Sequence, residues 1–454
     1  MKNGNLKNTI SNKIVCTVAL FVIGFISGNS QSADDIELSF QIASPSNSPE
    51  YGIATTLNSV CPTITNPQSE EQTNLNSVCT FFLDTTQGTP EAKIEISKEL
   101  SAKNTSSNNA SIARPAFSSG FSGINLRLSA LRKGTKSISQ NKYTLLPFYV
   151  PNRFVKNANS SSNEPGGLFS QRLSAYINLS TASGEYIETN TEAGFDDSSK
   201  SVLLGMDYRI GLNSFVGIAS NYTSNDLELS DPGSKITASQ YQILLYASHM
   251  LSENWYLQLS LQGANQNIEM TRAINLVLAT PVNEIANADT TGNQLGINLS
   301  TGYDKHFGSG YSGAIAASVN YLSSHIDGYS ESGAPGFNLN VNEQDITSLN
   351  SDVKLALSAN YSFSWGLVLP QLSAAWIHEY KQQGDTITAS FLTDPNNTPF
   401  SFTTQDADPN YFVFGATIQA LFTGGRSAFL SVNSIQKLRD RKHLAAMLGY
   451  RMEF

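Results

Sequence analysis

Charged residues are scarce in this chain: only 14% of its 454 residues are Asp, Glu, Lys or Arg. A typical globular domain carries about 25%. Ser, Thr, Asn, Gly and Tyr fill the gap, and the formal net charge is −9. No basic patch recurs along the chain, so this balance excludes an electrostatic nucleic-acid partner. Low charge combined with 10% aromatic residues fits a membrane barrel better than a cytosolic enzyme.

Long hydrophobic runs are also missing. The only signal-like stretch is 14–26, which follows Lys2, Lys7 and Lys13 and precedes a group of small residues. We predict that 1–33 is a signal peptide read by the Sec translocon. An uncleaved anchor is the alternative, although a spanning helix needs about 20 residues. No later segment could be a transmembrane helix, so membrane insertion would require a closed β-barrel.

Cysteine is rare, with three in the whole chain, and one of them lies inside the predicted signal peptide. The remaining pair, Cys61 and Cys79, would form one disulfide in an oxidising compartment. Two unpaired buried thiols are the alternative. No His lies near this pair, so we expect neither a metal site nor a cofactor.

Histidine is equally sparse, and none of the five His residues lies in the segment 34–111. A Ser-His-Asp triad there is excluded, because the nucleophile would have no base. His378 and Glu379 are adjacent, so in a strand they point to opposite faces. We therefore predict no catalytic residues, and a barrel-borne enzyme with a site in the lumen stays as an alternative.

The feature that is present in abundance is alternation of apolar and polar residues. In the last segment the apolar face carries Leu444, Ala446, Leu448, Tyr450, Met452 and Phe454. Such a strand suits a barrel in which one face meets lipid and the other a wet lumen. Similar segments predict twelve antiparallel strands near 170–184, 200–212, 214–226, 237–251, 254–271, 291–306, 311–327, 346–363, 366–381, 409–422, 426–437 and 442–454. Short turns alternate with polar loops, of which 227–236, 272–290, 328–345 and 382–408 are among the longest.

Composition divides the chain before the barrel into two further parts. The segment 34–111 is short and contains two weakly helical stretches, 51–60 and 70–82. The segment 112–167 is a linker with a predicted helix at 117–132. This helix would place Phe121, Ile124, Leu128 and Leu131 near one face and end at Arg132. The barrel then occupies 168–454.

Several stretches, in this order, resemble the autotransporter β-domain of type V secretion. They are INLRLSALRKG at 124–134, EAGFD at 192–196, GMDYRI at 205–210, TTGNQ at 290–294, AAWIHEY at 374–380, DPNNTPF at 394–400, GRSAFL at 425–430 and LGYRMEF at 448–454. The resemblance covers roughly 112–454 and implies a twelve-stranded barrel with a helix inside its pore. It also implies that Tyr450, Met452 and Phe454 are read by the barrel-assembly machinery.

The chain departs from the family in two respects. Its segment before the linker has no repeats and is short for a passenger. Some members cut themselves at an Asn-Asn pair, where this chain has Ser122 and Gly123, so self-cleavage is not implied.

We therefore expect a protein of the bacterial outer membrane, in contact with outer-membrane lipid, that translocates or anchors its own N-terminal segment. That segment would lie on the surface or in the periplasm. A porin-like diffusion pore, or an adhesin that binds through loops 272–290 and 382–408, is the alternative.

Overall fold

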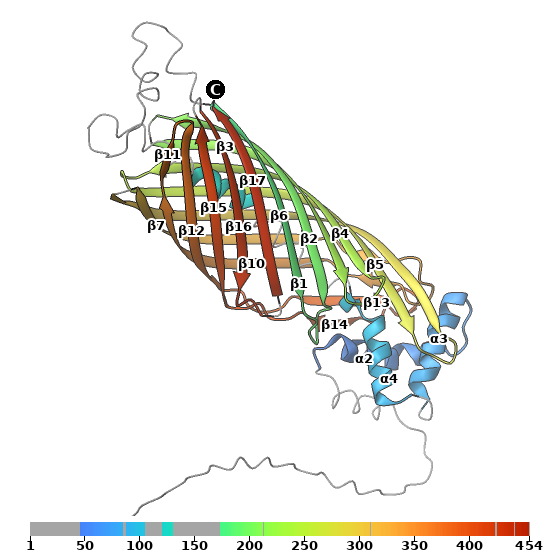
Figure 1. The fold of residues 1–454 in the computed structure, drawn as a ribbon. Coiled ribbons are helices and arrows are strands. Elements are labelled where there is room, and N and C mark those ends of the chain that lie inside the picture. Colours follow the sequence, from blue (N-terminus) through green and yellow to red (C-terminus); the bar gives the residue numbers. More distant parts are fainter. Residues whose placement is uncertain are drawn as a thin grey trace, which may run out of the picture.

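The computed structural model describes residues 46–84, 88–104, 120–129, 173–211, 213–308, 310–422, 425–439 and 441–453. Its body is a tilted cylinder of strands with a small helical module at one end (Figure 1). The predicted signal peptide lies outside the described residues, as do Leu131, Arg132 and Phe454.

Twelve long strands form the cylinder, and each pairs antiparallel with its neighbours along the chain. They are β1 (Leu173–Tyr186), β2 (Phe195–Ile210), β3 (Ser214–Leu229), β4 (Lys235–Met250), β5 (Trp255–Leu276), β6 (Val282–Gly308), β7 (Tyr311–Ile326), β10 (Gln344–Ala359), β12 (Gly366–Glu379), β15 (Asn410–Phe422), β16 (Arg426–Gln436) and β17 (Arg441–Glu453). The short β11 (Tyr361–Phe363) pairs only with β12. Pairing of β17 with β1, from Ser174↔Glu453 to Tyr186↔Arg441, closes the barrel. The prediction of a twelve-stranded antiparallel barrel is confirmed.

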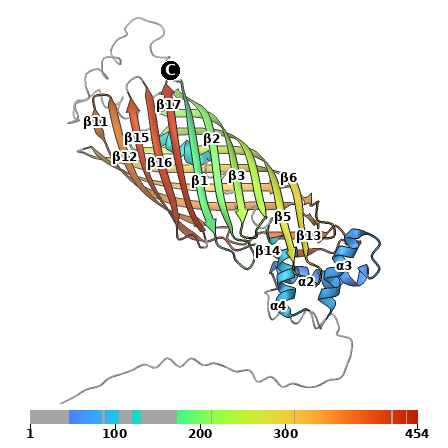
Figure 2. The same cartoon turned by 45° about the vertical axis from the view of Figure 1, so that its right-hand side comes forward.

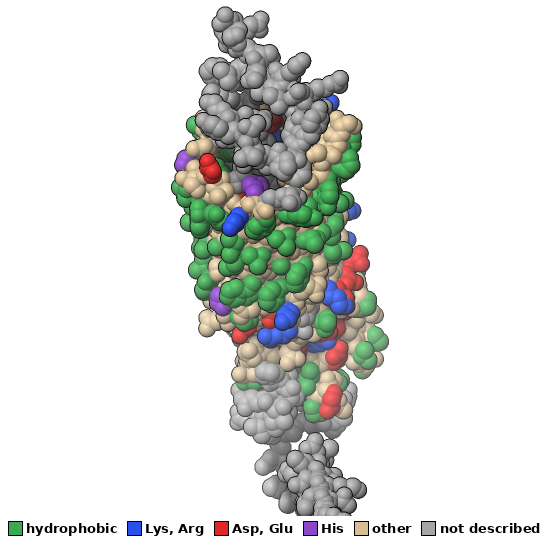
Figure 3. Space-filling view, turned by 60° about the vertical axis from the view of Figure 1, so that its left-hand side comes forward, with side chains coloured by type: hydrophobic (Ala, Val, Ile, Leu, Met, Phe, Trp, Pro, Cys, Tyr) green, Lys and Arg blue, Asp and Glu red, His purple; other side chains and the backbone are tan. Residues whose placement is uncertain are grey.

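The outer surface carries the apolar half of the alternation. On β2 the side chains of Leu204 and Met206 are 54% and 50% exposed, whereas Asp207 is buried on the inner face. The space-filling view shows hydrophobic side chains gathered in a band over the strands (Figure 3). This pattern, apolar outward and polar inward, is that of a barrel that meets lipid.

Near the loop end of the longest strands, the apolar residues change from the outer face to the inner face. On β5, Leu257 and Leu261 face outward and Gln258 faces inward, but further along Ile268 and Ile274 are buried on the inner face. Polar residues such as Asn267 and Glu269 then face outward. On neighbouring β3 and β4 the rings of Tyr222 and Tyr241, 4.9 Å apart, mark the same level. Aromatic pairs of this kind are typical of the membrane interface, so the strands continue beyond the lipid.

This reversal explains why the prediction of a polar loop at 272–290 is wrong. The strand β5 runs to Leu276 and β6 begins at Val282, so only the tip between them is a turn. Over this stretch the apolar residues have moved to the inner face, and a search for an apolar outer face misses them. Similarly, half of 227–236 belongs to β3 and β4.

The segments 328–345 and 382–408, also predicted as polar loops, contain a second sheet. Its four strands are β8 (Tyr329–Ser330), β9 (Leu339–Val341), β13 (Thr386–Phe391) and β14 (Phe400–Thr403), in the order β14-β13-β9-β8. Each is short, and alternation over so few residues is weak evidence in a sequence.

The helical module, which we call the cap, consists of residues 46–84 and 88–104. Its helices are α2 (Pro49–Val60), α3 (Glu70–Leu83) and α4 (Pro90–Leu100), with short 3₁₀ turns η1 (Cys61–Ile64) and η2 (Ala102–Asn104). Side chains of Ser48, Ser69 and Thr89 cap the three helices by accepting hydrogen bonds from backbone N–H groups. The first two helices match the predicted stretches, whereas α4 was missed because few of its residues are apolar. Among the described residues no helix is long and apolar enough to cross a membrane.

A disulfide joins Cys61 to Cys79 and thereby links η1 to α3. The hydrophobic core of the cap is continuous with that of the barrel end. Its buried side chains form one cluster with the second sheet and with the inner faces of the strand ends; members include Ile53, Leu57, Leu75, Phe82, Leu100, Ile268, Ile274, Leu339, Phe391 and Phe402. The cap and the loop end of the barrel therefore fold as one unit.

Candidate functional site: the pore helix and the capped end

A helix at 120–129, which we call the pore helix, lies inside the barrel, within the predicted 117–132. The position of Gly123 shows this directly, because a Cβ there would lie 3.1 Å from Asn178 Nδ2 on β1 and 3.5 Å from Leu203 on β2. The cap lies at the loop end of the barrel, and β1 begins at the opposite end, beside the C-terminus (Figures 1 and 2). The pore helix, which follows the cap in sequence and precedes β1, sits within the lumen.

One face of the pore helix is apolar and packs on one side of the lumen. Phe121, Ile124 and Leu128 are buried in a cluster with side chains from β1, β2, β3, β4 and β7, which are Tyr176, Leu203, Phe215, Ala219, Leu244, Tyr246 and Leu322. Most inward-facing residues of β2 are polar or glycine, as at Gly205 and Asp207, but Leu203 is an inward-facing apolar residue. It packs against the pore helix, which explains this break in the alternation.

A buried ion pair fixes the pore helix to the wall. Arg127 Nε donates to Asp207 Oδ2 at 2.6 Å, and Arg127 Nη2 donates to Asp207 Oδ1 at 2.6 Å. Ser174 Oγ accepts from Nη2 at 2.7 Å and donates to Asp207 Oδ1 at 2.6 Å. A bidentate guanidinium–carboxylate pair has strict geometry, so this pair sets the rotation and height of the helix.

Two tyrosines extend this network across the lumen wall. The Arg127 guanidinium lies 5.5 Å from the centre of the Tyr176 ring, and Tyr176 Oη donates to Tyr246 Oη at 2.9 Å. Both rings lie across glycines on neighbouring strands. A Cβ at Gly205 would come within 2.3 Å of Tyr176, and one at Gly217 within 2.1 Å of Tyr246. The glycines make room for the rings that hold the helix.

On its other side the pore helix borders a cavity. A cavity of about 550 Å³ is lined by Ser122, Asn125 and Ser129 of the helix and by strands β10, β12, β15 and β16 opposite. Small side chains such as Ala356 and Ser373 form that wall. Among the described residues, the pore helix packs against one side of the lumen and leaves this cavity on the other.

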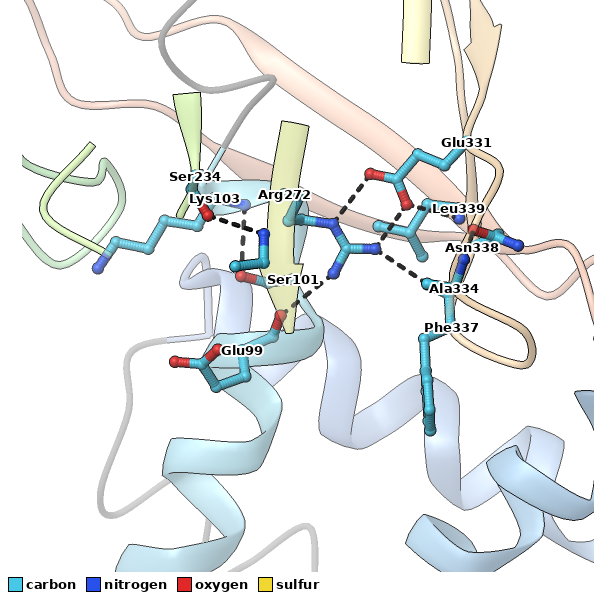
Figure 4. A network of polar contacts seen from close by, with 11 residues as sticks. Glu99, Ser101, Lys103, Ser234, Arg272, Glu331, Ala334, Phe337, Asn338 and Leu339 are labelled. Atoms are coloured by element: carbon cyan, nitrogen blue, oxygen red, sulfur yellow. Dashed lines mark hydrogen bonds and ion pairs between the residues drawn. The ribbon is translucent and has the colours of Figure 1, made fainter. Parts of the chain in front are cut away.

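A second buried ion pair joins the cap to the barrel end. Arg272 on β5 is fully buried; its Nε and Nη2 bond to Glu331 Oε1 and Oε2 at 2.9 and 2.5 Å. Nη2 also donates to the Phe337 carbonyl, and Nη1 donates to the Glu99 carbonyl at the end of α4 (Figure 4). Glu331 additionally accepts from the Leu339 backbone N–H. One side chain thus connects a barrel strand, the second sheet and the cap.

Charged groups around this junction complete the contact. Lys98 and Lys103 of the cap both bond to Glu188 in the loop after β1, at 2.9 and 3.0 Å. Burial raises the pKa of the Glu99 carboxyl to about 7, and the negative charge of the nearby Asp231 contributes less to the same shift. Burial opposes the charged form of Glu188 as well, but its bonds to Lys98 and Lys103 lower its pKa overall.

The remaining predicted residues lie as follows. Tyr450 is 41% exposed on the outer face of β17, Met452 is half-buried, and their recognition by the assembly machinery stays a prediction. His378 lies half-buried on the outer face beside Trp376, with Nδ1 3.0 Å from Asn410 Oδ1. Glu379 is buried on the other face, where it accepts from Ser348.

Sequence reasoning missed Arg127 and Arg272, the two arginines that form the buried ion pairs. Arg127 follows Ile124 by three residues on the apolar face of the helix, so a charge in an otherwise apolar row could have identified it. Arg272 lies in a stretch interpreted as loop, where a charged residue attracts no notice.

The translocator domain of the autotransporter NalP from Neisseria meningitidis matches with a TM-score of 0.50 at 12% identity, over 66% of this chain and 93% of that one. The beta domain of the Bordetella autotransporter Brka matches with a TM-score of 0.46 at 14% identity, over 62% and 100%. At 12% identity, the likeness to the NalP domain shows the fold alone.

No curated protein matches the sequence. The family described as "Autotransporter beta-domain" does match, over residues 175–433, which is more than half of the chain and includes most of the barrel. This match agrees with the closed barrel and with an outer-membrane function. The chain belongs to the autotransporter β-domain family.

Proposed function

We propose that this barrel carries its own N-terminal segment through the outer membrane and keeps it docked as a cap on the cell surface. The observation that supports the proposal is the order of parts along the chain. The cap lies at the loop end, the pore helix lies in the lumen, and β1 starts at the turn end (Figure 2). In outer-membrane barrels the short turns face the periplasm and the longer loops face outward. The cap would then be outside the cell.

Retention of the cap follows from its shared core. The cap buries Leu57, Leu75 and Leu100 against strand ends and the second sheet, and Arg272 bonds to it directly. Release of the cap would expose the apolar side chains that the cap and the barrel end bury against each other. We therefore infer that it stays attached to the barrel and is not released.

The role is physical and not catalytic in this proposal. His378 and Glu379 lie on opposite faces, as the Trp376 and Ser348 contacts indicate. Of the segments named for the adhesin alternative, 272–290 is largely strand, and 382–408 contributes β13 and β14 to the second sheet. We further propose export through the Sec translocon and insertion by the barrel-assembly machinery through the last strand.

Threading of the chain is tested by an engineered cross-link inside the lumen. Gly123→Cys combined with Asn178→Cys should form a disulfide on mild oxidation, because a Cβ at position 123 would lie 3.1 Å from the end of the Asn178 side chain. Gly123→Cys combined with Leu179→Cys is the matched control, since Leu179 is the next residue of β1 and is 45% exposed on the lipid face. Both proteins should first show the heat-dependent gel mobility of a folded barrel.

A cross-link in the first pair and none in the control pair would support the proposal. A folded barrel with no cross-link in either pair would show that the helix is outside the lumen, and the proposal would fail.

A further inference from the structure

We propose that the loop between β16 and β17 binds the phosphate groups of glycolipids in the outer leaflet of the membrane. The first observation is a concentration of basic residues in this loop. The chain has 28 Lys and Arg among its 454 residues, yet four of them fall within 437–442, against one Asp. These four are Lys437, Arg439, Arg441 and Lys442. A basic cluster beside a membrane surface attracts anionic lipid headgroups.

Lys442 lies at the edge of the lipid-facing band. Its neighbours Arg441 and His443 line the lumen cavity, so Lys442 points outward, and its side chain is 76% exposed. The next outward residue of β17 is Leu444, which is 51% exposed. Lys442 pairs with Glu185 at 2.8 Å, but such an exposed pair is weak, and an ammonium group has three N–H donors. The Lys442 ammonium can therefore donate to a second anion.

Lys437 lies at the same edge, directly after β16. Its Nζ lies 5.4 Å from the centre of the Phe412 ring on β15. Tyr411 and Val413 line the lumen cavity, so Phe412 faces outward, as does Phe414, which is 50% exposed. A lysine stem packs on apolar surface while its ammonium stays at the water. Lys437 is thus placed where acyl chains meet headgroups.

The backbone at Lys437 favours a role for its side chain. Its φ is 60°, in the left-handed region that few residues other than glycine adopt. Glycine would adopt this conformation without a steric cost, so the turn itself does not explain a lysine here. Unusual backbone of this kind is concentrated at functional sites. Lys437→Gly is therefore a variant that removes the ammonium and relaxes the backbone.

The charge is of opposite sign across the barrel. Strands β3 to β6 extend beyond the level of the Tyr222–Tyr241 pair, and among their described residues exposed carboxylates there outnumber Lys235. These carboxylates belong to Asp226, Glu228, Glu269 and Asp289. Like charges repel, so lipid phosphates should gather beside β16 and β17 and not beside the extended strands. The lipid contact would then have a fixed position around the barrel.

An amphiphile fits this surface better than an acidic protein or a free phosphate. The strands that lead to the basic loop expose Phe414, Leu430 and Leu444 on the lipid face. Acyl chains cover such a face in the membrane. A ligand with acyl chains and phosphates would therefore satisfy both the apolar band and the ammonium groups. The outer leaflet supplies phosphorylated glycolipids when the loop end faces outward, so this inference rests on the proposed function.

The first test measures binding of lipid A to the full chain, folded in micelles of a neutral detergent, by native mass spectrometry. Micelles have no sidedness, so the result is independent of the orientation of the cap. Lipid A whose phosphates have been removed enzymatically should bind about tenfold more weakly than intact lipid A. Equal binding of the two lipids would overturn the proposal. Complete displacement of lipid A by an equal concentration of inorganic phosphate would assign the loop to a free anion and overturn it too.

The second test compares two variants with the same change in net charge. K437G/K442Q removes two ammonium groups from the loop, whereas K235Q/K305Q removes two exposed ones from the extended strands and the turn end. Both proteins should keep the heat-dependent mobility of a folded barrel. Binding of lipid A should weaken about tenfold or more in the first and less than about twofold in the second. Unchanged binding in K437G/K442Q, or equal weakening in both, would refute a phosphate site at this loop.

Discussion

Arg272 and Glu331 form a bidentate ion pair with no exposure of the guanidinium, and the same Arg272 holds the last turn of α4 through the Glu99 carbonyl. The two residues lie 59 positions apart in sequence. They meet only when β5 extends beyond the membrane and the segment after β8 folds over it. Their contact therefore reports assembly of the whole outer end of the protein.

Removing one partner of this pair should loosen the cap. Glu331→Gln would leave Arg272 buried and without its counter-charge, which typically costs about 3–5 kcal/mol. We expect faster cleavage of the cap by added protease, while the heat-dependent mobility of the barrel remains.

Lys442→Ala is the control for that variant. It removes one partner of an exposed pair with Glu185, at 2.8 Å and with 76% and 51% side-chain exposure. Exposed pairs contribute little, so the cap should stay resistant. Equal protease sensitivity of the two variants would contradict the role given to Arg272.

The ion pair between Arg127 and Asp207 should stabilise the pore helix locally. Asp207→Ala would leave Arg127 buried without its partner, at a cost of about 3–5 kcal/mol. Backbone amides of 120–129 should then exchange hydrogen faster by mass spectrometry. Asp226→Ala, which changes an outward-facing residue of β3, should leave that exchange unchanged. Unaltered exchange in Asp207→Ala would show that apolar packing alone holds the helix.

Which parts of the fold the sequence predicts depends on how far apart in the chain the contacting residues lie. The lipid-facing strands were predictable, because residues such as Leu204 and Met206 repeat with period two. The outer fold was not, because its core joins Leu57, Ile274 and Phe391 from segments far apart in sequence. Those residues lie on the inner face, whereas the strands were predicted from apolar residues on the outer face.

The same distinction applies to the site. The apolar face with Phe121, Ile124 and Leu128 is local to one helix and was found. The partner of Arg127 is 80 residues away. No local pattern could connect them.

Docking of the cap should depend on pH through Glu99. Burial, with help from Asp231, raises its folded pKa from 4.5 to about 7. A carboxyl whose pKa is raised on folding binds more protons in the folded state, so stability falls as pH rises. The contribution is fully present below the unfolded pKa and is lost as pH passes from about 4.5 through about 7.

Protease resistance of the cap should therefore decline between these pH values. The decline in protease resistance with pH should be smaller in Glu99→Gln, because an amide side chain does not titrate in this range. A cap whose resistance rises over the same window in the unaltered protein would contradict the direction assigned to Glu99.

The disulfide should stabilise the cap and not the barrel. Cys61 and Cys79 are separated by 18 residues, and closing a loop of this size is worth about 3 kcal/mol. Cys61→Ser with Cys79→Ser should lower the temperature at which the cap becomes protease-sensitive and leave the barrel mobility shift intact. Loss of the barrel in this variant would mean that the cap is needed for barrel assembly.

The central claim, that the chain runs through its own barrel and presents the cap outside, is tested most directly by labelling intact cells. Glu91→Cys places a thiol on the exposed start of α4, and Glu253→Cys places one in the short turn between β4 and β5. A membrane-impermeant maleimide should label Glu91→Cys on intact cells and Glu253→Cys only after the outer membrane is permeabilised. The reverse pattern, with Glu253→Cys labelled first, would place the cap in the periplasm and contradict the account.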